Sequence, residues 1–134
     1  MTDIVIRGGR ALLGNEIIQS DLRTAGREIT GAASDHGRNT LEIDAEGLLA
    51  LPGIVDLHGD AFERQMMPRP GVDFPLDVAL VDSDRQAVSN GITTVYHATT
   101  WSWEPGLRGA DNARKLLETI EAMRPQLAAD TRFH

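Results

Sequence analysis

A ten-residue stretch over 51–60, Leu-Pro-Gly-Ile-Val-Asp-Leu-His-Gly-Asp, constrains the fold of this chain most strongly. It opens on the turn pair Pro52-Gly53, and a short apolar run follows, which predicts a strand buried on both faces as in a parallel sheet. His58 and Asp60 stand two residues apart at the end of this strand, so we expect their side chains to point the same way. Such a pair can place one nitrogen and one oxygen on a divalent metal ion. The alternative is a histidine bonded to a backbone carbonyl beside a solvated aspartate.

Helices and strands are predicted to alternate in the rest of the chain. The predicted elements are a long loop over 59–73, a helix over about 75–90, a strand over 92–96, a helix around 113–123 and the start of a strand from 131. Asp84 interrupts the apolar stripe of the first helix, which should stop at Asn90-Gly91. Asp111 is the expected cap of the second helix. This order of elements is typical of a parallel α/β fold.

Residues 1–50 differ from the rest because short alternating stretches are separated by frequent turns. Their spacing predicts several short strands that form a small sheet or half-sandwich. Gly8-Gly9 predicts a hairpin turn, and Gly14-Asn15 predicts another turn. His36 lies in a stretch whose composition predicts a loop, and we interpret it as a solvated residue.

The composition excludes several classes of function. The net charge of −7 argues against a general surface for nucleic acid or anionic membranes, although a local arginine cluster could still bind a phosphate. The chain has no cysteine, which excludes a disulfide framework and a cysteine-based zinc site. Its start lacks the pattern of a signal peptide, and no stretch approaches the roughly 20 apolar residues of a membrane span. Cytoplasm is therefore the expected location.

The loop that follows Asp60 carries two arginines, Arg64 and Arg69, between prolines and a glycine that restrict its path. At the carboxyl end of a barrel strand, such a loop would lie on the face that holds active sites. Guanidinium groups match phosphate oxygens in a bidentate way, so these residues are candidates for binding a phosphate. The alternative is that Arg69 pairs with a carboxylate and holds the shape of the loop.

The turn, strand and ligand pair over 52–60 resemble the first barrel strand of the amidohydrolase superfamily. Three motifs resemble one branch of it, the ribose methylphosphonate triphosphate diphosphatases of the carbon–phosphorus lyase pathway. They are His58-x-Asp60-x-x-Glu63-Arg64, Met67-Pro68-Arg69-Pro70-Gly71-Val72 and Gly91-Ile92-Thr93-Thr94-Val95. Four positions depart from that branch: Gly59, Ala61 and Arg64 replace threonine, asparagine and lysine, and His97 stands where an aspartate is more frequent. The departures concern the substrate more than the metal chemistry.

The resemblance implies an α/β fold that is the N-terminal part of a composite protein. Residues 1–50 would form the first part of a small β-sandwich, and residues 51–134 the first βα units of a (β/α)8 TIM-like barrel. A complete barrel takes about 250 residues. We therefore expect a chain truncated after about two βα units, which is inactive by itself. Its unpaired strand 92–96 should recruit partners, so a homo-oligomer is expected.

The resemblance also implies a metal-dependent hydrolase. His58 and Asp60 would ligate the metal, Asp60 would be the catalytic residue, and Glu63, Arg64 and Arg69 would bind substrate. Zinc is the expected metal, with manganese and iron as alternatives. The implied reaction cuts a phosphoanhydride of a phosphorylated ribose phosphonate and releases pyrophosphate, as part of phosphonate metabolism.

Two other functions stay open at this point. One is a carbon–nitrogen hydrolase that acts on an amide or cyclic amide, or a deacetylase, and the other is a purely structural fragment. His97 is expected to lie in the core or to support the metal ligands from behind, rather than to be a ligand itself. Trp101 and Trp103 are expected to cover a rim or an interface.

Overall fold

The computed structural model describes residues 3–26, 28–31 and 40–134, and the chain divides into two compact units, Met1–Pro52 and Gly53–His134. The expected loop around His36 lies outside the described residues. In the part of the chain that is described, no helix is long and apolar enough to cross a membrane.

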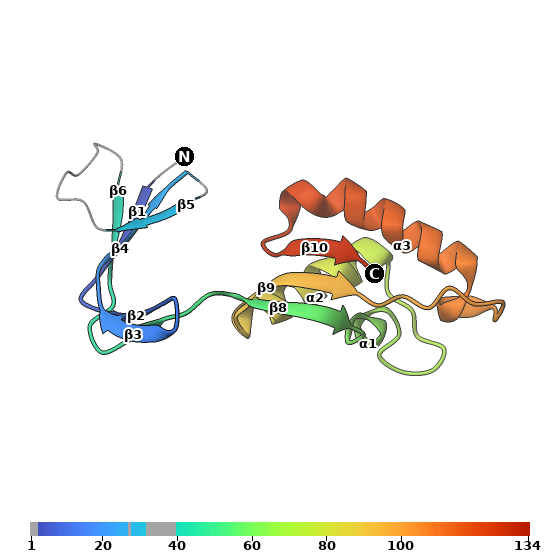
Figure 1. Ribbon diagram of the computed structural model, residues 1–134. Coiled ribbons are helices and arrows are strands. Elements are labelled where there is room, and N and C mark those ends of the chain that lie inside the picture. The colour runs from blue at the N-terminus through green and yellow to red at the C-terminus, as the bar shows by residue number, and fades with distance from the viewer. Residues whose placement is uncertain (1–2, 27, 32–39) are drawn as a thin grey trace. The chain divides into compact units, whose positions relative to one another are not determined.

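The first unit contains two small sheets (Figure 1). Strands β1 (Asp3–Arg7), β4 (Leu22–Ala25), β5 (Glu28–Gly31) and β6 (Thr40–Asp44) form one sheet in the order β5-β4-β1-β6. Strands β2 (Arg10–Leu13), β3 (Glu16–Gln19) and β7 (Leu49–Ala50) form the other in the order β3-β2-β7. The short strands predicted for this region are thus observed.

Of the two glycine turns that the sequence predicts in the first unit, one joins the strands of a hairpin and the other does not. Strands β2 and β3 form a hairpin in which Leu13 pairs with Glu16 across the turn at Gly14, whose φ is 62°. Gly8 also has a positive φ, 71°, but β1 pairs with β4 and β6 instead of β2. The predicted hairpin at Gly8 is therefore wrong, because the chain there passes from one sheet to the other.

The second unit is a parallel sheet covered by helices on one face (Figure 1). Its strands β8 (Ile54–Gly59), β9 (Ile92–His97) and β10 (Asp130–Phe133) are parallel, in the order β10-β9-β8. Its helices are α1 (Phe62–Met66), α2 (Leu76–Ser89) and α3 (Ala110–Met123), with 3-10 turns at Gly106–Arg108 and Arg124–Gln126. The predicted alternation of strand and helix is confirmed. Strand β9 lies between two partners, so the expectation that it lacks a neighbour is wrong, and β8 and β10 are the edges.

The sequence predicts one end of α2 and one end of α3, and only the first prediction is confirmed. Helix α2 ends at Asn90 and Gly91, as predicted; Gly91 has a φ of 78°, and its N–H donates to the Val88 carbonyl over 3.0 Å. Asp111 is not the cap of α3, because Gly109 takes that position and Asp111 pairs with Arg114 in the first turn.

The region 59–73 is not only a loop, because it contains helix α1. Phe62 and Met66, four residues apart, are both buried and form one face of this short helix. Burial of two large apolar side chains, each worth about 1.5–3 kcal/mol, outweighs the weak helical tendency of five isolated residues.

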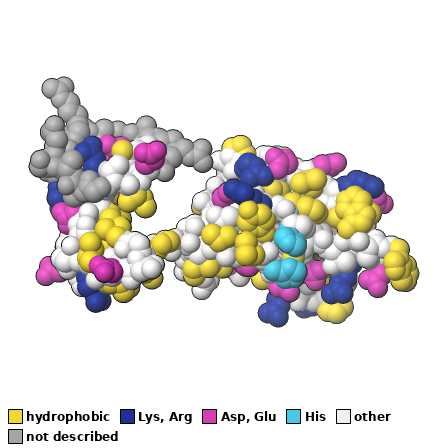
Figure 2. Space-filling view, viewed as in Figure 1, with side chains coloured by type: hydrophobic (Ala, Val, Ile, Leu, Met, Phe, Trp, Pro, Cys, Tyr) yellow, Lys and Arg dark blue, Asp and Glu magenta, His cyan; other side chains and the backbone are white. Residues whose placement is uncertain are grey.

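A single apolar cluster joins the three helices of the second unit. Its buried members are Phe62, Met66, Ala79, Leu80, Leu116 and Ile120, with Leu76, Leu107, Met123, Leu127 and Phe133 packed against it. The opposite face of the sheet is not covered, since Val55 and Leu57 are 53% and 66% exposed. Figure 2 shows hydrophobic side chains on this open face.

The polar residue that interrupts the stripe of α2 has a structural role. Asp84 is 3% exposed, and its carboxylate accepts hydrogen bonds from the backbone N–H groups of Ala128 and Ala129. It also accepts one from Arg85 over 2.6 Å. Because Ala128 and Ala129 lead into β10, Asp84 anchors the last strand to α2.

Candidate active site at the strand ends

The pairing of β8 with β9 is irregular around His58. Asp56 pairs in register with Val95, and pairing resumes at Gly59 opposite His97, so three steps along β8 match two along β9. An extra residue of this kind is a β-bulge, which bends a strand and re-aims its side chains. The His58 N–H donates to the Asp56 carboxylate over 3.0 Å and so stabilises the bulge.

A hollow of about 280 Å³ lies at the carboxyl ends of the three parallel strands, and we call it the strand-end hollow. It is lined by His58, Asp60, Glu63, Ala98, Thr99, Thr100, Arg108 and His134. His58 lies near the end of β8, and the other lining residues come after β8, β9 or β10 in the chain. The carboxyl ends of these strands meet at one edge because the strands are parallel. Segments far apart in the sequence therefore meet at this hollow.

Two pairs of side chains approach each other in the strand-end hollow. The rings of His58 and His134 lie edge to face, with centroids 5.8 Å apart. Figure 2 shows histidine side chains, in cyan, at the surface of the second unit. Arg108 Nη2 lies 3.9 Å from Glu63 Oε2, and both side chains are partly exposed. The lining of the hollow thus includes one guanidinium, that of Arg108, and two carboxylates, those of Asp60 and Glu63.

The structure brings some of the predicted site residues together and leaves others apart. His58, Asp60 and Glu63 line the hollow, whereas Arg64 and Arg69 are exposed outside its lining. The Arg69 carbonyl accepts a hydrogen bond from the Val72 N–H over 3.1 Å, which holds the backbone of the loop. In the described residues, Arg69 forms no ion pair, so the alternative of a carboxylate partner is not observed either.

The arginine that does line the hollow, Arg108, was missed by sequence reasoning. It ends the 3-10 turn Gly106–Arg108, directly before the N-cap of α3. Its only sequence signal is a position in the loop after the second barrel-type strand, where active-site residues of such folds occur.

The donor set for a metal is partial. Across 3–26, 28–31 and 40–134, no three His, Cys, Asp or Glu side chains lie close enough together to hold a metal ion. His58 and Asp60 nevertheless supply an imidazole nitrogen and carboxylate oxygens on one hollow, donors that suit zinc, manganese or iron. The two residues fit part of a metal site that needs further ligands.

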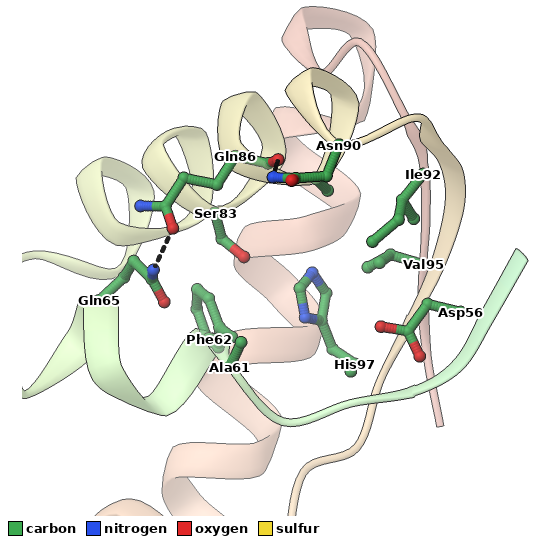
Figure 3. A pocket seen from close by; sticks show the side chains of 12 residues that line it. Asp56, Ala61, Phe62, Gln65, Ser83, Gln86, Asn90, Ile92, Val95 and His97 are labelled. Atoms are coloured by element: carbon green, nitrogen blue, oxygen red, sulfur yellow. Dashed lines mark hydrogen bonds between the residues drawn. The ribbon is translucent and has the colours of Figure 1, made fainter. Parts of the chain in front are cut away.

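His97 lies on the helix side of the sheet, in a second cavity shown in Figure 3. It is 3% exposed, and its ring lies 5.0 Å from that of Phe62, so its predicted place in the core is confirmed. Burial lowers the pKa of His97 to about 4, and attraction to the Asp56 carboxylate opposes the shift. The ring is therefore neutral at pH 7.

No protein-family model matches the chain. The α-D-ribose 1-methylphosphonate 5-triphosphate diphosphatase of Escherichia coli (strain K12) is 32% identical over 119 residues, which cover 88% of this chain and 32% of that protein. Adenine deaminase 1 of Rhizobium meliloti (strain 1021) is 32% identical over 97 residues, covering 69% of this chain and 17% of that protein.

Two solved structures share the fold. Molinate hydrolase matches with a TM-score of 0.65 at 22% identity, over 98% of this chain and 29% of that one. The D-hydantoinase of a Thermus species matches with a TM-score of 0.63 at 20% identity, over 98% of this chain and 27% of that one. The chain thus spans about a third, or less, of the length of each of these proteins.

The parallel strands, the hollow at their ends and these matches agree with the resemblance to the amidohydrolase superfamily, a class of hydrolases. Within that class it is similar to the ribose methylphosphonate triphosphate diphosphatase of Escherichia coli. The resemblance stated from the motifs around His58 and Arg69 is thereby confirmed.

Proposed function

We propose that this chain provides the first part of a metal-dependent hydrolase site, built at the strand-end hollow. The observation that carries the proposal is that His58 and Asp60 line one hollow at the carboxyl ends of three parallel strands. In a (β/α)8 barrel this end holds the chemistry. The uncovered sheet face, with Val55 and Leu57, would then be part of the barrel interior, and residues 1–50 part of a companion β-sandwich.

His58 and Asp60 would hold a divalent cation, with zinc expected and manganese or iron as alternatives. When bound, such a cation acts as a Lewis acid and lowers the pKa of water that it contacts. An Asp60 oxygen that is not engaged by the cation can accept a proton from the attacking water. Zinc usually takes three or four protein ligands, so further donors are required beyond these two residues.

The substrate proposed is a phosphoanhydride of a phosphorylated ribose phosphonate, with release of pyrophosphate. Two observations support it: the match to the diphosphatase over 88% of this chain, and the guanidinium of Arg108 in the hollow. Substrate binding by Glu63, Arg64 and Arg69 stays a prediction, and for the two arginines it would have to involve a part of the substrate outside the hollow.

A second candidate is a carbon–nitrogen hydrolase. The match to an adenine deaminase favours it, because that protein acts on a neutral base. Such a substrate needs no guanidinium partner. The two candidates therefore differ in what they require of Arg108.

Metal binding tests the shared part of both candidates. Zinc and manganese titrations by calorimetry should show weak binding to the chain, and His58→Ala and Asp60→Asn should each reduce the affinity about tenfold or more. Asp77→Asn is the matched control, because Asp77 is exposed on α2 and does not line the hollow. Equal metal affinity in His58→Ala and the control would remove the basis of the proposal.

A further inference from the structure

We infer that Arg108, together with Thr99 and Thr100, forms the subsite that binds a phosphate group of the substrate. The inference rests on the proposed function for its reaction, and it deepens that function by naming where the phosphate lies. It transfers the phosphate-binding role from the predicted Arg64 and Arg69 to residues of the loop between β9 and α3.

The position of Arg108 supports this role. It lines the same hollow as His58 and Asp60, so a group bound to its guanidinium would lie next to the proposed metal ligands. Its side chain is 59% exposed, and its recorded ion pair, with Glu63, is long at 3.9 Å. An exposed and loosely paired guanidinium keeps most of its donors free for a bidentate contact with phosphate oxygens.

Thr99 and Thr100 supply further donors on the same wall. Both line the hollow directly after β9, and the loop is fixed there by the Ala98 N–H, which donates to the Gly59 carbonyl over 3.1 Å. Within the described ranges, neither the N–H nor the hydroxyl of Thr99 or Thr100 donates to another protein group. Free backbone and hydroxyl donors beside a guanidinium match the acceptor oxygens of a phosphate.

The acidic residues of the hollow oppose the binding of an anion at Arg108. Asp60 and Glu63 carry two negative charges against the single positive charge of Arg108, which weakens the binding of an anion. A bound phosphate would also compete with Glu63 for Arg108. Removing the Glu63 charge should therefore strengthen phosphate binding, whereas removing Arg108 should weaken it.

The test uses the chain without metal and with inorganic pyrophosphate as the probe, at low ionic strength. Binding is followed by the movement of backbone amide resonances in heteronuclear NMR spectra. Wild type, Arg108→Gln, Arg108→Lys, Glu63→Gln and Arg64→Gln are compared, and acetate serves as the control anion. Arg64→Gln separates this subsite from the substrate-binding role predicted for Arg64, which neighbours Glu63 in the sequence but lies outside the hollow.

Pyrophosphate should move the resonances of Thr99, Thr100 and Arg108. Arg108→Gln should weaken binding about tenfold, and Arg108→Lys by less, because lysine keeps the charge but lacks the fork. Glu63→Gln should tighten binding about two- to fivefold, a gain that a loss of structure would not produce. Arg64→Gln should leave the affinity unchanged.

The inference is overturned if Arg64→Gln weakens binding as much as Arg108→Gln, if acetate binds as well as pyrophosphate, or if the moving resonances lie outside the hollow. Its failure is separable from that of the proposed function. Loss of metal binding in His58→Ala with no pyrophosphate binding at Arg108 would reject only the phosphate subsite and favour a neutral substrate. An absence of metal binding would reject the hydrolase site itself.

Discussion

Asp84→Ala should strongly destabilise the second unit. The Asp84 side chain is 1% exposed, and its carboxylate accepts the N–H of Ala129 over 2.8 Å and that of Ala128 over 3.0 Å. Each hydrogen bond to a charged group contributes about 1.5–3 kcal/mol, so the loss of two sets a range of about 3–6 kcal/mol. Water that enters the vacated space would hydrogen-bond to the two N–H groups and recover part of this energy, so we expect the free energy of unfolding to fall by about 3 kcal/mol.

The ion pair with Arg85 adds little to this estimate. The Arg85 side chain is 55% exposed, and an exposed pair is worth under about 1 kcal/mol. The predicted effect therefore comes from the buried N–H groups that lead into β10, and not from the surface charge.

Urea-induced unfolding, followed by far-ultraviolet circular dichroism, measures the loss. For a domain of this size, about 3 kcal/mol corresponds to a fall in Tm of about 12–24 °C. Asp82→Ala is the matched control: Asp82 lies on the same helix, is exposed, and accepts a bond only from the Gln86 side chain in the described residues. It should change the free energy of unfolding by no more than about 0.5 kcal/mol.

Asp84→Asn keeps the reasoning testable if Asp84→Ala does not fold. The amide retains one acceptor oxygen of nearly the same size but loses the charge, so an intermediate loss is expected. If Asp84→Ala and Asp82→Ala had the same stability, the anchoring role of Asp84 would be refuted.

Three further predictions concern other parts of the second unit. Because burial lowers the pKa of His97 to about 4, the unfolded chain binds a proton at a higher pH than the folded chain does. The contribution of His97 to the free energy of unfolding is therefore full above pH 6.5 and should fall by up to about 3 kcal/mol as the pH drops to 4. His97→Gln should flatten this pH dependence in unfolding curves. Leu57→Glu places a charge on the open sheet face, where Leu57 is 66% exposed, and sedimentation should show less of the self-association expected for the wild-type chain. Gly53→Ala should destabilise by about 1–3 kcal/mol, because its Cβ would lie 2.1 Å from Thr93 Oγ1, and Thr93→Gly should restore stability measured by urea unfolding.

Local patterns in the sequence were sufficient for most elements of the second unit and for part of its candidate site. The existence of strand β8, the stop of α2 at Gly91 and the pair His58 and Asp60 follow from turn residues and apolar runs only a few residues long. The predicted burial of this strand on both faces is wrong, because its apolar side chains are more than half exposed in this chain. Such signals act over short distances along the chain, so they can be read without knowing what packs where. Helix α1 escaped this reading because its two buried residues, Phe62 and Met66, are too few to establish a period.

The tertiary structure alone decided which residues meet. Glu63 and Arg108 are 45 positions apart, and Asp84 binds N–H groups 44 and 45 positions away, so no local pattern could link them. The bulge before Gly59 likewise exists only in the pairing of β8 with β9. These contacts depend on the packing of helices against a parallel sheet, which brings the ends of separate strands to one edge. For that reason the sequence by itself indicated His58 and Asp60 as candidate metal ligands, whereas the fold placed Arg108, and not Arg69, in the same hollow.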